Sequence, residues 1–307
     1  MAGCGGQLDA GYDVLHGPLP IDERSAIVLV NDGARDNWQG EYAAILAASA
    51  RVRLVGLVVN STTEYPSLET NVTGYRQMLT AARDSGMRHL PEPTASIAPA
   101  LAEPSSGMIE DTVPNRSEGA RLILEAATAY GSVVHPLAIT TGGALTDVAD
   151  AYLLDPSLAE RAVVVASLGQ TEGDGASTFN PNGGRDRWAT FIVSTRMRLV
   201  QVNGYYDQLL DVPEERAAEL PQNAFGRWMA DKRPDILNVI LACDQITVLS
   251  AALPWFPADI THLRVDSADP MHLVPDATGL IWHVAQTDSA RARSEIWAAL
   301  KDPSTFQ

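Results

Sequence analysis

The alternation of short β-branched runs with longer helical segments constrains the fold more than any other feature of the sequence. The strand-like runs are AIVLV, VRLVGLVVN, PLAITT, RAVVVASLG and MRLVQVN. Between them, segments such as SEGARLILEAATAYG carry apolar residues at helical spacing. This βαβα order predicts an α/β fold with a mostly parallel, Rossmann-like open sheet and helices on both faces. In such a sheet the ligand site lies at the carboxyl ends of the strands.

Charge and composition narrow the class of partner. The chain has 307 residues, of which 46% are hydrophobic, so it can bury a large core. Its formal net charge is −16, from 38 acidic and 22 basic residues, and no Lys/Arg block interrupts it. A nucleic acid polymer is therefore excluded as a partner, because phosphate backbones are bound by clustered cations.

The first 24 residues differ from the rest. They lack periodicity and are rich in Gly and Pro, which predicts an irregular N-terminal extension (1–24) before one α/β domain (25–307). The MAGCGG start is similar to the end of a lipoprotein processing site, in which Cys4 would be acylated, but no apolar segment precedes it. Two localisations stay open: cytoplasmic, or exported as a lipoprotein if this is a truncated signal.

Four polar clusters follow strand-like runs. They are the turn at residues 32–37, the pair Gly142 and Gly143, the group Asn180, Asn182 and Asp186, and the pair Cys243 and Asp244. All are acidic, amide or bare backbone, an inventory that suits a hard cation such as Ca²⁺ or a polyhydroxylated ligand. Phosphate is a poor fit, since neither a Gly-rich Lys loop nor an arginine clamp accompanies them.

Each cluster also has a purely structural explanation. Asp36 and Asn37 are common turn formers and helix caps, Gly142 and Gly143 suit a tight turn, and Asp244 suits the start of a helix. Taken singly, each cluster leaves both interpretations open. Their recurrence at successive strand ends favours a binding site.

The series resembles the inosine-uridine-preferring nucleoside hydrolases from Ala26 to the C-terminal segment. The family's Asp-x-x-x-Asp-Asp turn looks like Asp32, Asp36 and Asn37, followed by an apparent insertion, WQGE. Its Gly-Pro-Leu-Thr-Asn segment looks like Gly143-Ala144-Leu145-Thr146-Asp147, its Glu-Phe-Asn segment like Asn180-Pro181-Asn182 with Asp186, and its His-Asp-Pro helix start like Cys243-Asp244-Gln245.

The resemblance implies Ca²⁺-dependent hydrolysis of the N-glycosidic bond of a ribonucleoside or a related N-riboside. Asp32 would bind the metal and act as general base on its bound water. The other implied metal ligands are Asn37, Asp244 and the backbone carbonyl at Gly142. The implied contacts to the substrate are Asp36, Asn180, Asn182 and Asp244, and Asn182 also counts with Asp32 as catalytic. The partner is a small-molecule nucleoside or riboside, and a homo-oligomer stays open.

Departures from the family pattern leave an alternative function open. Asn37 and Asn180 stand where the family has acids, and Cys243 takes the leaving-group position, where part of the family has a proton-donating histidine. Trp38 is a candidate for stacking on the base, although loop exposure or core packing explains it as readily. The alternative is a catalytically degenerate protein that binds a nucleoside or sugar on the same scaffold.

Overall fold

In the part of the chain that the structure describes, eleven strands form one mixed sheet in the order β3-β2-β1-β4-β5-β8-β11-β9-β10-β7-β6. This computed structural model describes residues 19–22, 24–33, 39–63, 65–169, 171–172, 176–178, 182–202, 220–236 and 244–301. Six residues singled out from the sequence lie outside these ranges: Cys4, Asp36, Asn37, Trp38, Asn180 and Cys243.

Seven neighbouring strands of the sheet run parallel. They are β3 (Pro93–Ala95), β2 (Arg53–Val59), β1 (Ala26–Asn31), β4 (Leu137–Thr141), β5 (Ala162–Ala166), β8 (Arg198–Val202) and β11 (Ile281–Thr287). An antiparallel extension continues the sheet through β9 (Pro257–Val265), β10 (His272–Pro275), β7 (Ala176–Thr178) and β6 (Thr171–Glu172). The predicted mostly parallel α/β sheet is confirmed.

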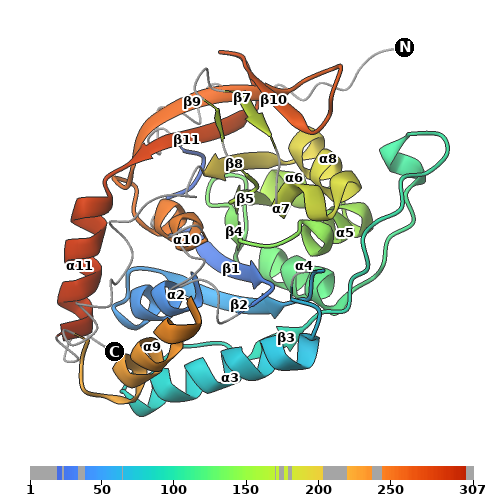
Figure 1. Ribbon diagram of the computed structural model, residues 1–307. Coiled ribbons are helices and arrows are strands. Elements are labelled where there is room, and N and C mark those ends of the chain that lie inside the picture. Colours follow the sequence, from blue (N-terminus) through green and yellow to red (C-terminus); the bar gives the residue numbers. More distant parts are fainter. Residues whose placement is uncertain are drawn as a thin grey trace.

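Helices cover both faces of the sheet (Figure 1). One core contains residues of α2 (Gln39–Ala48), α3 (Leu68–Asp84), α9 (Ala224–Ile236), α10 (Gln245–Ala252) and α11 (Ser289–Lys301). The other contains residues of α4 (Glu118–Tyr130), α5 (Thr146–Leu154), α6 (Leu158–Arg161) and α8 (Arg187–Arg196). Ile27 and Leu29 of β1 belong to the first core, whereas Val28 and Val30 belong to the second. This strand is buried on both faces because successive side chains point in opposite directions.

The strand order reverses between β1 and β4. The chain runs outward from β1 to β2 and β3, then returns to the other side of β1 to form β4, β5 and β8. In open α/β sheets such a switch point leaves a crevice at the carboxyl ends of the two central strands. Residues that follow β1 and β4 therefore stand at the preferred place for a ligand.

The described end of the predicted N-terminal extension contacts the first core. Leu19 and Ile21 are both buried there, so these residues pack as part of the domain. Among the described helices, none combines the length and the apolar character that crossing a membrane requires.

Candidate active site

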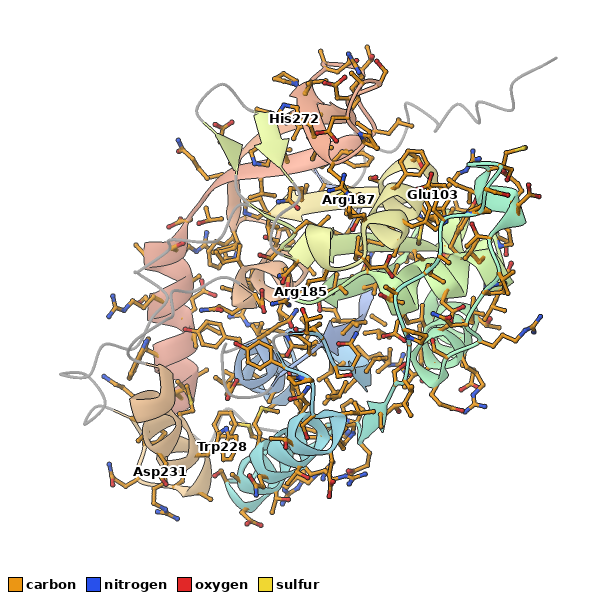
Figure 2. The ribbon with its side chains drawn as sticks, turned by 45° about the vertical axis from the view of Figure 1, so that its right-hand side comes forward. Glu103, Arg185, Arg187, Trp228, Asp231 and His272 are labelled. Carbon is orange, nitrogen blue, oxygen red and sulfur yellow. The ribbon has the colours of Figure 1, made fainter. Side chains whose placement is uncertain are left out.

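Asp32 is a buried carboxylate directly after β1, with 1% of its surface exposed. Its Oδ2 accepts hydrogen bonds from Thr62 Oγ1 and from Arg185 Nη1, both at 2.7 Å. Arg185 ends the short helix α7 (Asn182–Arg185) and lies near the middle of the molecule in Figure 2. The two donors on one oxygen fix the orientation of this carboxylate, and one of them is a cation.

Asp244 stands at the start of α10, but its side chain makes no capping hydrogen bond. The carboxylate packs against Gly142 instead: a Cβ added to Gly142 would lie 2.1 Å from Asp244 Cγ. Asp244 Oδ2 also accepts a long hydrogen bond of 3.4 Å from Asn31 Nδ2 at the end of β1. The explanation of Asp244 as a helix cap is therefore wrong. Glycine is needed at position 142 because a side chain there would overlap the Asp244 carboxylate.

Asp32 and Asp244 both lie against the Gly142 and Gly143 turn. A Cβ on Gly143 would lie 3.4 Å from Asp32 Cγ, which is an ordinary contact distance. The backbone N–H of Gly142 donates to the Val30 carbonyl at 3.3 Å and holds the turn against the end of β1. Two buried carboxylates thus border the same dipeptide at the switch point of the sheet.

Asn182 joins this group from α7. Its Nδ2 donates to the Gly142 carbonyl at 2.7 Å and to the Ser167 carbonyl at 2.8 Å, which links the ends of β4 and β5. The structure therefore brings together the predicted site residues Asp32, Gly142, Asn182 and Asp244. The other predicted site residues, Asp36, Asn37, Trp38, Asn180 and Cys243, lie outside the described residues.

A buried chain of hydrogen bonds supports the two acidic segments from behind. Asn31 Nδ2 donates to Gln39 Oε1 at 2.9 Å, and Gln39 Nε2 donates to Thr247 Oγ1 at 2.7 Å. The Thr247 hydroxyl donates in turn to the Asp244 carbonyl at 2.6 Å, and Tyr75 donates to Asn31 Oδ1 at 2.9 Å. Because each donor and acceptor here is buried and paired, the network ties the end of β1 to the start of α10.

Two other acids from the strand-end segments serve the fold. Asp186 caps α8 through Ala189 N at 3.0 Å, and it also accepts from Leu101 N and Thr146 Oγ1. Asp147 accepts hydrogen bonds from Ser96, Ser117 and Asn60, and burial raises its pKa above the usual range of a carboxyl. Both are structural carboxyls of the α5 and α8 region.

The sequence analysis missed Arg185 and Thr62. The inventory of acidic, amide and backbone groups was wrong in this respect, because a guanidinium lies on Asp32. Thr62 follows β2 and so had a strand-end signal, whereas Arg185 follows no strand of the parallel part of the sheet and had none. Glu41, an acid close to the first turn, instead accepts a hydrogen bond from Trp228 Nε1 at 3.1 Å.

No metal-binding cluster is found among the residues that the structure describes. They contain no group of three or more His, Cys, Asp or Glu side chains able to hold an ion. The carboxylates of Asp32 and Asp244 lie against the Gly142 and Gly143 turn, and the Gly142 carbonyl accepts a hydrogen bond from Asn182.

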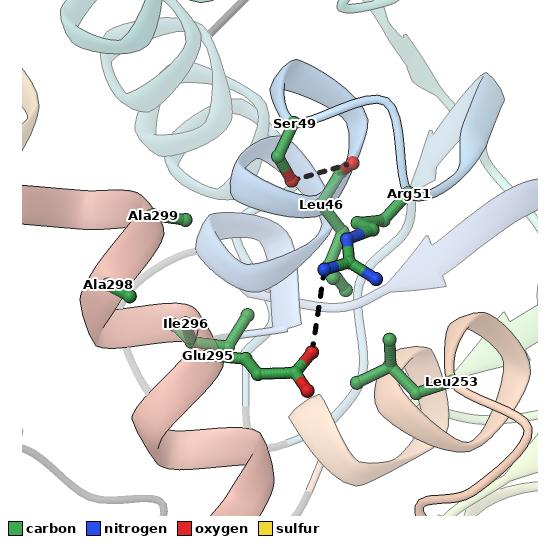
Figure 3. A pocket seen from close by; sticks show the side chains of 8 residues that line it. All are labelled: Leu46, Ser49, Arg51, Leu253, Glu295, Ile296, Ala298 and Ala299. Carbon is green, nitrogen blue, oxygen red and sulfur yellow. Dashed lines mark hydrogen bonds and ion pairs between the residues drawn. The ribbon is translucent and has the colours of Figure 1, made fainter. Parts of the chain in front are cut away.

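A separate cavity of about 500 Å³ lies between α2, α10 and α11 (Figure 3). Its lining includes Leu46, Leu253 and Ile296, and the ion pair of Arg51 with Glu295 spans 3.7 Å there. Arg51 precedes β2, so this cavity opens near the amino end of that strand. It contains none of the predicted site residues.

Comparison with known proteins identifies the fold. No protein-family model and no curated protein matches the chain. Among solved structures, the inosine-uridine preferring nucleoside hydrolase from Bacillus anthracis aligns with a TM-score of 0.66 and 15% identity, over 90% of this chain and 99% of that one. The purine-preferring ribonucleoside hydrolase from Gardnerella vaginalis gives 0.61 and 14%, over 91% and 99% of the two chains.

A third structural neighbour is an effector protein. The type III effector protein XopQ, in complex with adenosine diphosphate ribose, aligns with a TM-score of 0.58 and 13% identity, over 96% of each chain. Sequence identities this low establish a similar fold only, and the function has to be inferred from the site residues. The chain has the nucleoside hydrolase fold.

Proposed function

We propose that the protein hydrolyses the N-glycosidic bond of a ribonucleoside or a related N-riboside. The observation that carries this proposal is the buried Asp32 carboxylate at the switch point of the sheet, bordering the same glycine turn as Asp244. The names of several structural neighbours, which are nucleoside hydrolases, support the reaction class.

In this reaction a water oxygen attacks the anomeric carbon while Asp32 accepts the proton that the water gives up. The bond from that carbon to the base nitrogen breaks, and its electron pair leaves with the nitrogen. Positive charge develops on the sugar in the transition state. The negative charges of Asp32 and Asp244 stabilise that charge at short range in a buried setting.

The donor chemistry fits a hard divalent cation such as Ca²⁺. The carboxylates of Asp32 and Asp244 and the carbonyl of Gly142 are all oxygen donors, the ligand type that Ca²⁺ prefers. The two carboxylates carry two negative charges beside the single positive charge of Arg185. We infer that these residues would hold the ion together with Asn37, and that the bound ion would make water more acidic.

The remaining predicted residues complete the proposal. Asn182 holds the Gly142 carbonyl in place, while Asp36, Asn180 and Trp38 are proposed to contact the sugar and the base. Cys243 takes the leaving-group position, and a thiol with an ordinary pKa near 8.5 is a weak acid at neutral pH. We therefore expect a preference for ribosides whose leaving group needs no protonation, such as p-nitrophenyl riboside.

The test is release of free ribose from a panel of ribonucleosides and p-nitrophenyl riboside, with added calcium or with EDTA. Asp32→Asn should lose activity on every substrate that the wild type cleaves. Asp84→Asn, which changes an exposed carboxylate at the end of α3, is the matched control and should keep it. Wild-type protein that releases no ribose from any substrate in the presence of calcium contradicts the proposal.

One observation favours the alternative of a binding protein. The guanidinium of Arg185 at 2.7 Å from Asp32 stabilises the carboxylate and so weakens it as a base. Adenosine diphosphate ribose belongs in the panel, because the XopQ structure contains it. Binding of a riboside measured by calorimetry, without any release of ribose, selects this alternative.

A further inference from the structure

The ion pair between Arg185 and Asp32 differs from other arginine pairs of the described chain in its burial. Its side chains are 12% and 1% exposed, whereas those of Arg196 and Glu110 are 40% and 59% exposed. Exposed ion pairs such as that of Arg196 with Glu110 contribute little to the stability of a folded protein. A buried carboxylate, in contrast, needs a compensating charge, because desolvation of an unpaired ion is costly.

Arg185 belongs to α7, and the start of this helix is held at the candidate site by hydrogen bonds. At the start of α7, the Asn182 amide holds the carbonyls of Gly142 and Ser167. The next residue, Gly183, donates to the Leu168 carbonyl at 3.0 Å and accepts from Thr190 Oγ1 at 2.7 Å. The guanidinium therefore lies on Asp32 as a consequence of the local fold.

A cation bound by Asp32 would have Arg185 as a close neighbour of like charge. Ca²⁺ ligands lie 2.3–2.6 Å from the ion, and Arg185 Nη1 is 2.7 Å from one oxygen of the same carboxylate. At such separations, repulsion between like charges is large even with the effective dielectric constant of about 20 that suits protein sites. Arg185 must then weaken the binding of the ion or give up its contact with Asp32.

We propose that Arg185 and a divalent cation are alternative counter-ions of Asp32, so that Arg185 sets the affinity of the site for metal. This inference rests on the metal site of the proposed function. Without metal, Arg185 neutralises the buried carboxylate and holds it in place. With metal, the guanidinium releases Asp32 Oδ2, so it is a positioning residue whose contact depends on the ion.

Calcium titration by calorimetry on EDTA-treated, dialysed full-length protein tests the proposal. Arg185→Met should bind Ca²⁺ at least about tenfold more tightly than the wild type, because a like charge has been removed. Arg185→Lys keeps that charge and should stay close to the wild type. The matched control is Arg187→Met, which removes an exposed arginine two residues away, in a separate cavity beside Glu103 (Figure 2).

Thermal unfolding gives a second readout that does not depend on turnover. In EDTA, Arg185→Met should unfold at a lower temperature than the wild type, because Asp32 has lost its counter-ion, and added calcium should raise its midpoint more than that of the wild type. Arg185→Gln, which removes the charge but keeps a hydrogen-bond donor, is measured in parallel in both experiments, so that a neutral variant remains if Arg185→Met does not fold.

The outcomes separate this inference from the proposed function. Tighter calcium binding by the neutral variants supports it, as does binding by those variants alone, whether or not ribose is released. Equal calcium affinity in the wild type and both neutral variants overturns it. Absence of calcium binding in all of them also overturns it, even if the wild type hydrolyses ribosides.

Discussion

The carboxyl carbon of Asp244 occupies the space in which a side chain at Gly142 would begin, 2.1 Å from the position of its Cβ. Neither Gly142 nor Gly143 has the positive φ that favours glycine, so the close approach of Asp244 is what requires glycine at position 142. This contact brings the end of β4 and the start of α10 together at the candidate site.

Gly142→Ala should therefore displace Asp244, whereas Gly143→Ala should be tolerated. We expect the first change to destabilise the fold by about 1–3 kcal/mol, as overpacking does, and to weaken calcium binding about tenfold or more. The second places its methyl group 3.4 Å from Asp32 Cγ and should cost under about 1 kcal/mol. Urea unfolding and calcium titration of both variants measure the difference, and equal effects would contradict this account.

Substitution of Asp186 should lower the stability of the fold, whereas substitution of Asp244 should affect calcium binding. Asp186→Ala removes the cap of α8 and the partner of Leu101 N and Thr146, so we expect a loss of about 2–4 kcal/mol in the free energy of unfolding. Asp244→Asn removes no cap and should change stability by about 1 kcal/mol or less, yet abolish calcium binding. Urea unfolding with calorimetry on both variants decides between these roles.

Asn182→Asp should be more harmful than Asn182→Ala. The alanine variant loses two donors to buried carbonyls, at a cost of about 1–3 kcal/mol. The aspartate variant also directs a carboxylate oxygen at those carbonyl oxygens, so its midpoint of thermal unfolding should be the lower of the two. The account of Asn182 as a link between β4 and β5 is wrong if the aspartate variant is as stable as the wild type.

His283 should make the protein less stable in mild acid. Burial lowers the pKa of this histidine from 6.5 to about 4, with the nearby Asp259 opposing the shift. Between these values the unfolded chain binds the proton and the folded chain does not, so stability falls as the pH decreases from 6.5 toward 4. At 1.36 kcal/mol per pKa unit, a shift from 6.5 to about 4 corresponds to a loss of at most about 3.4 kcal/mol.

The test compares urea unfolding of the wild type and His283→Gln across this pH range. The variant should show a flatter dependence of stability on pH, because the group that takes up the proton on unfolding is gone. Asp147 contributes in the opposite direction, since its raised pKa makes its contribution fall as the pH rises above 3.8. That term is common to both proteins and cancels in the comparison.

Strand-end positions allowed much of the site to be predicted. In a parallel sheet the residues after successive strands meet at one edge, which accounts for Asp32 after β1 and Gly142 after β4. Asn182 joins them although it follows β7, an antiparallel strand far along the sheet, and Asp244 precedes α10 with no described strand directly before it. The same reasoning could not tell a site residue from a structural one in the same segment. Asp186 and Asn182 are four residues apart, yet one caps a helix and the other holds the Gly142 turn.

The spacing of apolar residues could not predict the contact made by the long side chain of Arg185, or the short strands β6 and β7. Arg185 reaches Asp32 from a segment 153 residues away, and an arginine in a polar, glycine-rich stretch resembles any solvated surface residue. The short strands β6 and β7 likewise have too few residues to show a strand pattern. Their pairing with the C-terminal part of the sheet depends on contacts that local spacing does not encode.

The hydrogen bonds of Asn31 and Gln39 join the N-terminal part of the chain to a segment that is synthesised much later. Asn31 ends β1 and Gln39 begins α2, but their partners Asp244 and Thr247 come 213 and 208 residues later. Contacts so distant in sequence form late, and chains fold from the N-terminus as they leave the ribosome. A nascent chain that ends after β8 can pair β3, β2, β1, β4, β5 and β8, yet it still lacks Asp244, so the candidate site cannot be complete until the C-terminal part has been synthesised.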